Sequence, residues 1–172
     1  MPRIEFGSVG EPFEQTEVRV RMAARALGRN DLGHAYGHVS ARVDADRFLV
    51  CAPKPMGLIT PDDKGTIVPV NGPLPDGVLG EVRCHQQIYK RRNDVNGIAR
   101  TFLRNTMTLS TFERTPEVRI GFGSYFSPSP PLWNDPLLLR DDNMASDLAE
   151  TLGGSRAIVM RGNGCILTGG TV

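Results

Sequence analysis

The sequence of 172 residues has few of the residue types that define several protein classes. It has only three cysteines, Cys51, Cys84 and Cys165, which are widely spaced and include no Cys-x-x-Cys pair. Neither a disulfide framework nor a cysteine-based zinc site is therefore indicated, and we expect reduced thiols that pack mostly as small apolar groups. There are also only three histidines, so a three-histidine metal site would need all of them.

The chain also lacks an excess of charge of either sign and any long apolar run. Its net charge is +1, which indicates neither a nucleic-acid partner nor a membrane surface. No stretch is apolar enough for a transmembrane helix, and the first ten residues carry Arg3 and Glu5 without a signal-peptide core. We therefore expect a cytoplasmic protein.

What is present is typical of a folded domain. Hydrophobic residues make up 40% of the chain and charged residues 23%, and the length fits a single domain, residues 1–172, with a sizeable core. The 19 glycines and 13 prolines are spread along the chain. They separate short elements, which favours a turn-rich sheet.

The hydrophobic periodicity predicts an α/β fold, in which a mixed sheet is flanked by helices. On the first helix, Val18, Met22, Ala26 and Leu27 fall on one apolar face. The segment from 121 to 134 is rich in Gly, Ser and Pro and is predicted to be a loop. The predicted helices are 13–29, 81–91, 103–112 and 141–152, and the predicted strands are 37–42, 47–52, 66–70, 96–99, 156–161 and 166–167.

Several polar residues could carry chemistry, but each also has a simpler interpretation. Glu81 and His85 share a helix face at a spacing of four, which suits half of a metal site or a helix-capping pair. His38, on a strand after a Gly-rich turn, fits a hydrogen-bonded structural histidine. Arg100, beyond a short strand, would favour a carboxylate or phosphate ligand, although surface arginines are common. Asn163, in a Gly-Asn-Gly turn after a strand, fits a ligand contact or a plain turn.

Taken together, these segments resemble the class II aldolase/adducin family. The order and distances agree from about residue 18 to residue 168, and the Gly-His-Val-Ser sequence is closest to the branch that includes hydroxymethylpyridine-dicarboxylate decarboxylases. The segments are Tyr36-Gly-His-Val-Ser-Ala-Arg42, Arg47-Phe-Leu-Val50, Ile59-Thr-Pro-Asp-Asp63, Glu81-x-x-x-His85-x-x-Ile88-Tyr89 and Met160-Arg-Gly-x-Gly164.

The resemblance implies a changed metal site. Family enzymes hold a divalent metal with a His-x-His pair and a third histidine, and a glutamate acts as acid and base. Glu81 matches that glutamate, whereas the three histidine positions hold Arg100, Phe102 and Asn163. Asparagine is a poor zinc ligand and the other two side chains are none. We therefore expect neither a metal nor another cofactor.

The resemblance thus implies a metal-independent lyase, a decarboxylase or retro-aldol enzyme, acting on a small carboxylated substrate that can be aromatic. Glu81 would act as acid and base, and Arg100 and Asn163 would stabilise the developing anion. The pocket wall would comprise His38, Ser40, Phe102 and Arg161, with His85 behind it. Two alternatives remain open: a non-catalytic binding or assembly protein, or a cyclase, isomerase or oxidative decarboxylase on the same scaffold.

The resemblance also suggests an assembly. Family domains usually continue beyond the last matched turn and strand with at least one more helix, and this helix is expected to be absent here. Its absence would leave an apolar sheet surface for a partner subunit. We therefore expect a homo-oligomer, a dimer or a tetramer.

Overall fold

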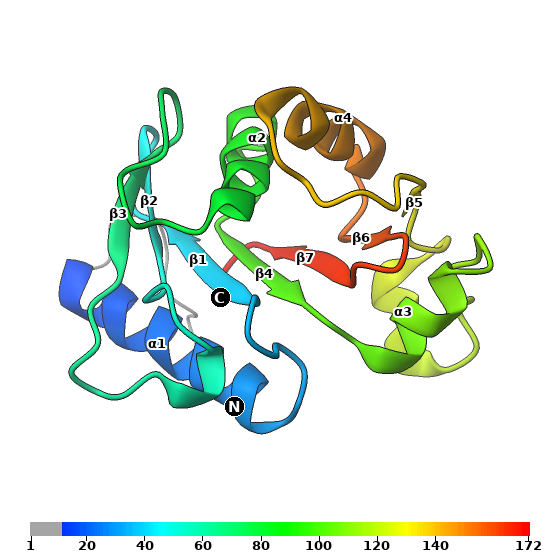
Figure 1. Cartoon of the computed structure of the whole chain (residues 1–172), viewed down its shortest axis with the longest axis horizontal. Helices are drawn as coiled ribbons and strands as arrows, with labels where there is room; N and C mark the ends of the chain where they lie inside the picture. The colour runs from blue at the N-terminus through cyan, green and yellow to red at the C-terminus, as the bar shows by residue number, and fades with distance from the viewer. Residues whose placement is uncertain (1–11) are drawn as a thin grey trace, which may run out of the picture.

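A seven-stranded sheet runs through the centre of the computed structural model, which describes residues 12–172 (Figure 1). Neighbouring strands are antiparallel except for β5 and β6, which are parallel. The predicted mixed sheet flanked by helices is confirmed. In spatial order the strands are β3 (Thr66–Pro69), β2 (Arg47–Val50), β1 (His38–Arg42), β4 (Gly97–Thr101), β7 (Cys165–Gly169), β6 (Ala157–Met160) and β5 (Leu132–Trp133).

Helices cover both faces of this sheet, with α1 on one side and α2 and α4 on the other (Figure 1). Asp141 caps α4 as the sequence predicts, because its carboxylate accepts a hydrogen bond of 2.9 Å from the backbone N–H of Met144. The helices are α1 (Phe13–Arg29), α2 (Arg83–Arg91), α3 (Arg104–Ser110) and α4 (Asp142–Leu152), and 3-10 turns span Met56–Leu58, Gly80–Val82 and Gly121–Phe126. None of the helices in residues 12–172 has the length and apolarity needed to cross a bilayer.

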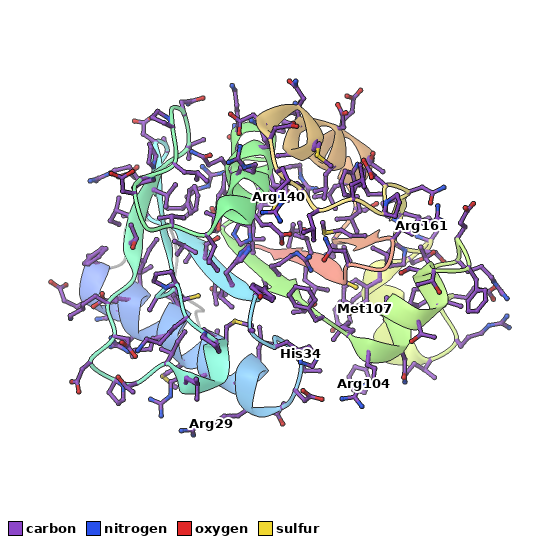
Figure 2. All side chains as sticks on the ribbon, viewed as in Figure 1. Arg29, His34, Arg104, Met107, Arg140 and Arg161 are labelled. Carbon is purple, nitrogen blue, oxygen red and sulfur yellow. The ribbon has the colours of Figure 1, made fainter. Side chains whose placement is uncertain are left out.

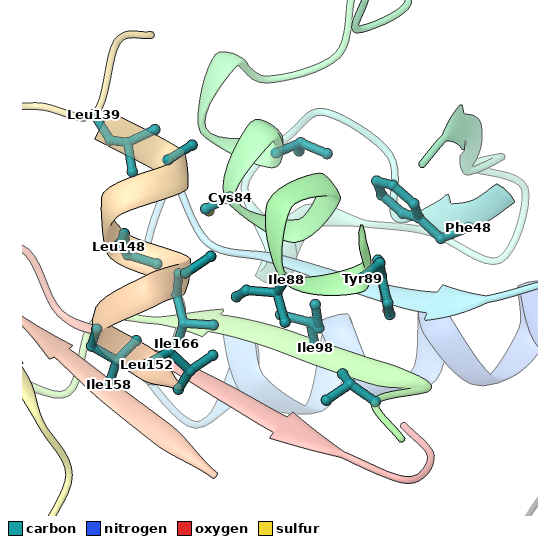
Figure 3. Packing of buried hydrophobic residues seen from close by; sticks show 14 of the residues in the cluster. Phe48, Cys84, Ile88, Tyr89, Ile98, Leu139, Leu148, Leu152, Ile158 and Ile166 are labelled. Atoms are coloured by element: carbon teal, nitrogen blue, oxygen red, sulfur yellow. The ribbon is translucent and has the colours of Figure 1, made fainter. Parts of the chain in front are cut away.

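The main core lies between the sheet and the pair α2 and α4 (Figure 3). Ile88 and Leu148 from the two helices meet Ile98 and Ile166 from β4 and β7, and all four are fully buried. Burying an aliphatic side chain of this size contributes about 1.5–3 kcal/mol, so this layer fixes α2 firmly over β1 and β4. The three cysteines are also buried and free, as expected.

The predicted apolar face of α1 is wrong for most of its members. Val18 and Met22 are 44% and 63% exposed and Ala26 is exposed, and only Leu27 packs against the core; the buried residues are instead Val20 and Ala24, which pack against the sheet. The helix carries apolar residues on two sides, and only contact with β1 and β2 decides which side is buried.

The predicted loop at 121–134 is also wrong in part. It contains the 3-10 turn at Gly121–Phe126 and the two-residue strand β5. A strand this short has no period of its own, and it forms only because β6 supplies a parallel neighbour.

Candidate active site

A cleft of about 550 Å³ opens at the start of α2, where segments far apart in the sequence meet. Three sequence-predicted residues besides Glu81 line it: His38 on β1, Phe102 after β4 and Asn163 in the turn after β6. Arg140, just before α4, completes the wall. The structure therefore brings most of the predicted site together.

Arg100 is a buried cation next to this cleft. It is fully buried on β4, directly opposite His38 in the β1–β4 register. Its Nη2 lies 3.4 Å from Oε2 of Glu81, its Nη1 donates a hydrogen bond of 2.9 Å to the carbonyl oxygen of Thr101, and its guanidinium carbon lies 4.3 Å from the ring centre of Phe102. Burial lowers the pKa of Arg100, and the Glu81 carboxylate opposes that change. An arginine nevertheless keeps its proton in proteins, so the positive charge is fixed.

Polar atoms without a partner gather at this place. Among the described residues, no hydrogen-bond partner exists for Nε of Arg100, Nδ2 of Asn163 or Nε2 of His38, although all three atoms are buried, whereas Nη2 of Arg100 and Oε2 of Glu81 face each other at 3.4 Å. Buried polar atoms are nearly always paired with protein, water or ligand. Because Nε of Arg100 and Nδ2 of Asn163 are N–H donors in any protonation state, the arrangement favours a ligand that presents acceptor oxygens.

The turn that holds Asn163 depends on its two glycines. Gly162 and Gly164 have φ values of 64° and 81°, which glycine adopts readily. A Cβ on Gly164 would lie 2.2 Å from the carbonyl oxygen of Thr101 and 2.7 Å from Nη1 of Arg100. Only glycine lets the turn approach β4 this closely, and that approach sets Asn163 in the cleft wall.

Behind His38 lies a chain of buried hydrogen bonds. His38 Nδ1 is 2.9 Å from His85 Nε2, and His85 Nδ1 is 2.6 Å from the Ser40 hydroxyl, which lies 3.0 Å from that of Tyr89. Burial lowers the pKa of His38 well below its usual value, with smaller contributions from His85 and Arg100. Burial, and secondly Arg100, lowers the pKa of His85 to about 3. Both imidazoles are therefore neutral at physiological pH.

Other polar residues considered from the sequence lie elsewhere. The Nη1 atom of Arg161 is 3.1 Å from Glu113 Oε1 and 3.2 Å from Asn134 Oδ1. Figure 2 shows Arg161 on the β5 side of the molecule and Arg140 near the start of α2. His34 pairs with Asp31 at 3.5 Å, apart from the other two histidines.

Sequence reasoning missed Arg140, Arg83 and Tyr36, which also line the cleft. Arg83 is paired with Asp142 at 2.9 Å, whereas Arg140 has no ion pair in the part of the chain that the structure describes. No local pattern marks either arginine, because tertiary contacts decide which side chains of the first turn of α2 and of the segment before α4 reach the cleft. Their charges make the cleft attractive to anions.

The metal that the family resemblance implies does not fit these residues. Within residues 12–172 no group of three His, Cys, Asp or Glu side chains could hold a metal ion. The one carboxylate, Glu81, faces the guanidinium of Arg100 at 3.4 Å, and this fixed cation would repel a divalent ion. We therefore derive no chemical step through a metal.

Comparison with known proteins agrees with this architecture. The class II aldolase and adducin N-terminal domain matches residues 18–172. The fold is similar to L-fuculose-1-phosphate aldolase from Thermus thermophilus, with a TM-score of 0.79 and 23% identity over 92% of this chain and 81% of the other. The fold is also similar to an aldolase II superfamily protein from Pseudomonas syringae. The TM-score is 0.75, and the sequence identity is 22% over 96% of this chain and 72% of the other.

A third similar structure is a sugar-phosphate aldolase from Thermotoga maritima, with a TM-score of 0.72 and 18% identity over 92% of this chain and 86% of the other. No curated protein matches the sequence significantly. At these identities the structural neighbours establish the fold alone, whereas the domain match covers most of the chain. The chain therefore belongs to the class II aldolase and adducin N-terminal domain family.

Proposed function

We propose that this domain is a metal-independent lyase that breaks a carbon–carbon bond in a small carboxylated substrate, by decarboxylation, retro-aldol cleavage or related carbanion chemistry. The observation that carries the proposal is the fully buried Arg100 guanidinium, 3.4 Å from Glu81 and beside a cleft whose wall holds the unpartnered amide Nδ2 of Asn163. Structural neighbours named as aldolases support the reaction class, because aldolases cleave carbon–carbon bonds.

Each side chain has a role in the proposal. Glu81, whose side chain is 22% exposed, is placed to exchange a proton with the substrate. Arg100 and Asn163 supply the positive charge and an N–H group that stabilise a developing anion. The Phe102 ring offers an apolar surface on which an aromatic substrate can stack. We assign the recognition of a substrate carboxylate to Arg140 rather than to Arg161, which is paired with Glu113.

The catalytic claim is tested with variants that keep the pocket volume. Small 2-oxo acids, hydroxy acids and aromatic carboxylic acids are screened for release of CO₂ or an aldehyde. Glu81→Gln and Arg100→Met should each lower kcat by about a hundredfold or more, since general acid–base catalysis contributes roughly 10²–10⁴ and one oxyanion donor a similar factor. Arg104→Met is the control, because Arg104 is exposed and paired with Asp31. Activity that survives both site substitutions would contradict the proposal.

The metal-free claim has its own test. Elemental analysis of protein purified without chelator should find less than stoichiometric zinc or manganese, and a chelator should leave both the melting temperature and any turnover unchanged. One tightly held metal per chain would overturn the claim and would favour the metal-dependent mechanism of the family.

A non-catalytic binding or assembly role is the second candidate, and exposed apolar side chains in the segment between α3 and β5 favour it. Phe112, Ile120 and Phe122 are all strongly exposed, Phe122 by 82%. Exposed large apolar side chains of this kind are what an interaction site would use. A protein that binds carboxylates in the cleft but never turns them over would support this role.

A cyclase, isomerase or oxidative decarboxylase on the same scaffold is the remaining alternative, and it would be recognised by its reaction products.

We also propose that the domain forms a homo-oligomer. The exposed face of α1, including Val18, Met22 and Ala26, borders a groove of about 560 Å³, and a hollow of about 410 Å³ continues over the sheet beside Leu167. A second copy could cover this apolar surface. Light scattering at micromolar concentration should show a dimer or tetramer, and Met22→Glu should weaken it. A wild-type monomer would contradict the proposal.

A further inference from the structure

The buried chain behind the cleft has a direction that its geometry reveals. His38 and Ser40 point to the same side of β1, because they are two residues apart on a strand. His85 and Tyr89 share the facing side of α2 at a spacing of four. Four side chains of two elements thus form one line of contacts, from Tyr89 through Ser40 and His85 to His38 at the cleft.

The shortest contact favours one of its two groups as the donor. The Ser40 oxygen lies 2.6 Å from His85 Nδ1, and the distance fits either tautomer of His85. Hydroxyl donors make hydrogen bonds of this length, whereas N–H donors are usually about 2.9 Å from their acceptor. The distance therefore favours donation from the Ser40 hydroxyl to His85 Nδ1, and we start from this donor. The Tyr89 hydroxyl can in turn donate to Ser40, whose hydroxyl oxygen is 3.0 Å away and whose carbonyl oxygen is 3.2 Å away.

The remaining protons follow from this first donor. A neutral imidazole carries one N–H, so His85 must hold its proton on Nε2 and donate it across 2.9 Å to Nδ1 of His38. The single proton of His38 is then on Nε2. That atom is buried on the cleft wall and has no partner among the described residues.

We propose that Ser40 and His85 hold His38 as a neutral imidazole with its proton on Nε2, and that this N–H is a fixed donor for an anionic oxygen of the ligand. The inference deepens the proposed function by assigning the ligand oxygen's partner. Ser40 and His85 are positioning residues, whereas His38 itself would touch the ligand. A neutral donor gives up no proton, so it binds an anion without requiring acid conditions.

The surroundings of His38 favour this neutral state. It is buried, and the nearby cation of Arg100 opposes a second positive charge. Among residues 12–172, Glu81 is the only carboxylate in the cleft wall, and it lies against Arg100. The titratable and charged groups that face His38 or share its cavities are Tyr36, Cys51, Glu81, Arg83, His85, Arg100 and Arg140.

The first experiment reads the tautomers directly. Nitrogen-15 NMR of histidine-labelled full-length protein distinguishes N–H from bare ring nitrogens, and His34→Asn, His38→Asn and His85→Asn assign the three residues. We expect His38 and His85 to be neutral and protonated on Nε2 throughout the range from about pH 5.5 to 8, which spans the usual histidine pKa. A proton on Nδ1 of His38, or an imidazolium at about pH 6, would overturn the proposal.

A matched pair of variants tests the positioning role. Ser40→Ala removes the donor and should give a mixture of tautomers at His85 and His38, whereas Ser40→Thr keeps a hydroxyl and should restore the Nε2 form. Unchanged tautomers in folded Ser40→Ala would show that the chain does not set the direction. Because the wild-type spectrum already decides the tautomer, a variant that fails to fold leaves the proposal testable.

The second experiment adds pyruvate and benzoate as probes. Either carboxylate should shift the His38 Nε2 signal, and His38→Ala should weaken its binding by about tenfold or more, as expected when a hydrogen bond to a charged group is lost. No shift with either probe would overturn the ligand assignment. Both readouts are independent of turnover, so an inactive protein that shows them would refute the proposed lyase function and leave this inference standing.

Discussion

Acidification should destabilise this protein before its carboxylates are protonated, because two neutral histidines are buried in the core. The folded-state pKa of His85 is about 3 and that of His38 is also lowered, whereas an unfolded histidine titrates at about 6.5. Below pH 6.5 the unfolded chain therefore binds more protons than the folded one. The stability that these residues confer is fully present above pH 6.5 and is lost as the pH falls toward 3.

The magnitude follows from proton linkage. Between about pH 7.5 and pH 5, a buried histidine that stays neutral in the fold, as His85 does with a pKa of about 3, lowers the free energy of unfolding by about 2 kcal/mol, and His38 acts in the same direction. That is a large share of the roughly 5–15 kcal/mol of a typical domain. Carboxylates with a lowered pKa, such as Asp63 at about 2, add their effect mainly below about pH 5.

Urea unfolding at several pH values measures this slope. His85→Asn removes one of the two titrating groups and should clearly reduce the loss of stability between about pH 7.5 and pH 5, whatever its overall cost. Arg104→Met, at an exposed position, removes no histidine and is the control, which should keep the wild-type slope. Equal slopes in wild-type protein and His85→Asn would refute the reasoning, because His85 would then not be a neutral buried group.

Four further substitutions test the packing of the site and its surroundings. Gly164→Ala should lower the free energy of unfolding, measured by urea titration, by at least about 2 kcal/mol, because the added Cβ would lie 2.2 Å from a backbone oxygen. Gly162→Ala is the control: its Cβ would have its nearest contact at 3.8 Å, and the substitution should cost only about 1 kcal/mol. Arg100→Met should leave stability within about 1 kcal/mol or raise it, because it removes the desolvation of a buried cation and lets the partly exposed Glu81 hydrate, while it lowers kcat as given above. A loss above about 3 kcal/mol would contradict this. Asp141→Ala should lower the melting temperature by the few degrees that about 1 kcal/mol of N-cap stabilisation represents, and an unchanged melting temperature would contradict the capping role.

The sequence predicts elements well where their pattern is local. The first helix is predicted at 13–29, as observed, and Glu81, His85 and Tyr89 are predicted on one side of the second. The same periodicity fails to identify the buried face of α1, since that helix has apolar residues on two sides. Glu17 is even buried, where it pairs with Lys64 at 3.1 Å. A period reports where apolar residues lie, whereas burial depends on which of them meets the sheet.

In the candidate site, too, local motifs predict some features, whereas others depend on tertiary packing. The family motifs bring Glu81, Arg100 and Asn163 into one hypothesis, and the structure places them around one cleft or directly beside it. The partnership between His38 and His85 could not be found that way, because 47 residues separate them and no spacing rule links a strand to a later helix. Their contact exists because α2 packs over β1 and β4, and that packing rests on the apolar core in Figure 3. The direction of the hydrogen-bond chain is even harder to predict from the sequence, because it depends on a 2.6 Å distance rather than on residue identity. What the sequence specifies most weakly is therefore the protonation geometry on which the proposed anion recognition by His38 depends.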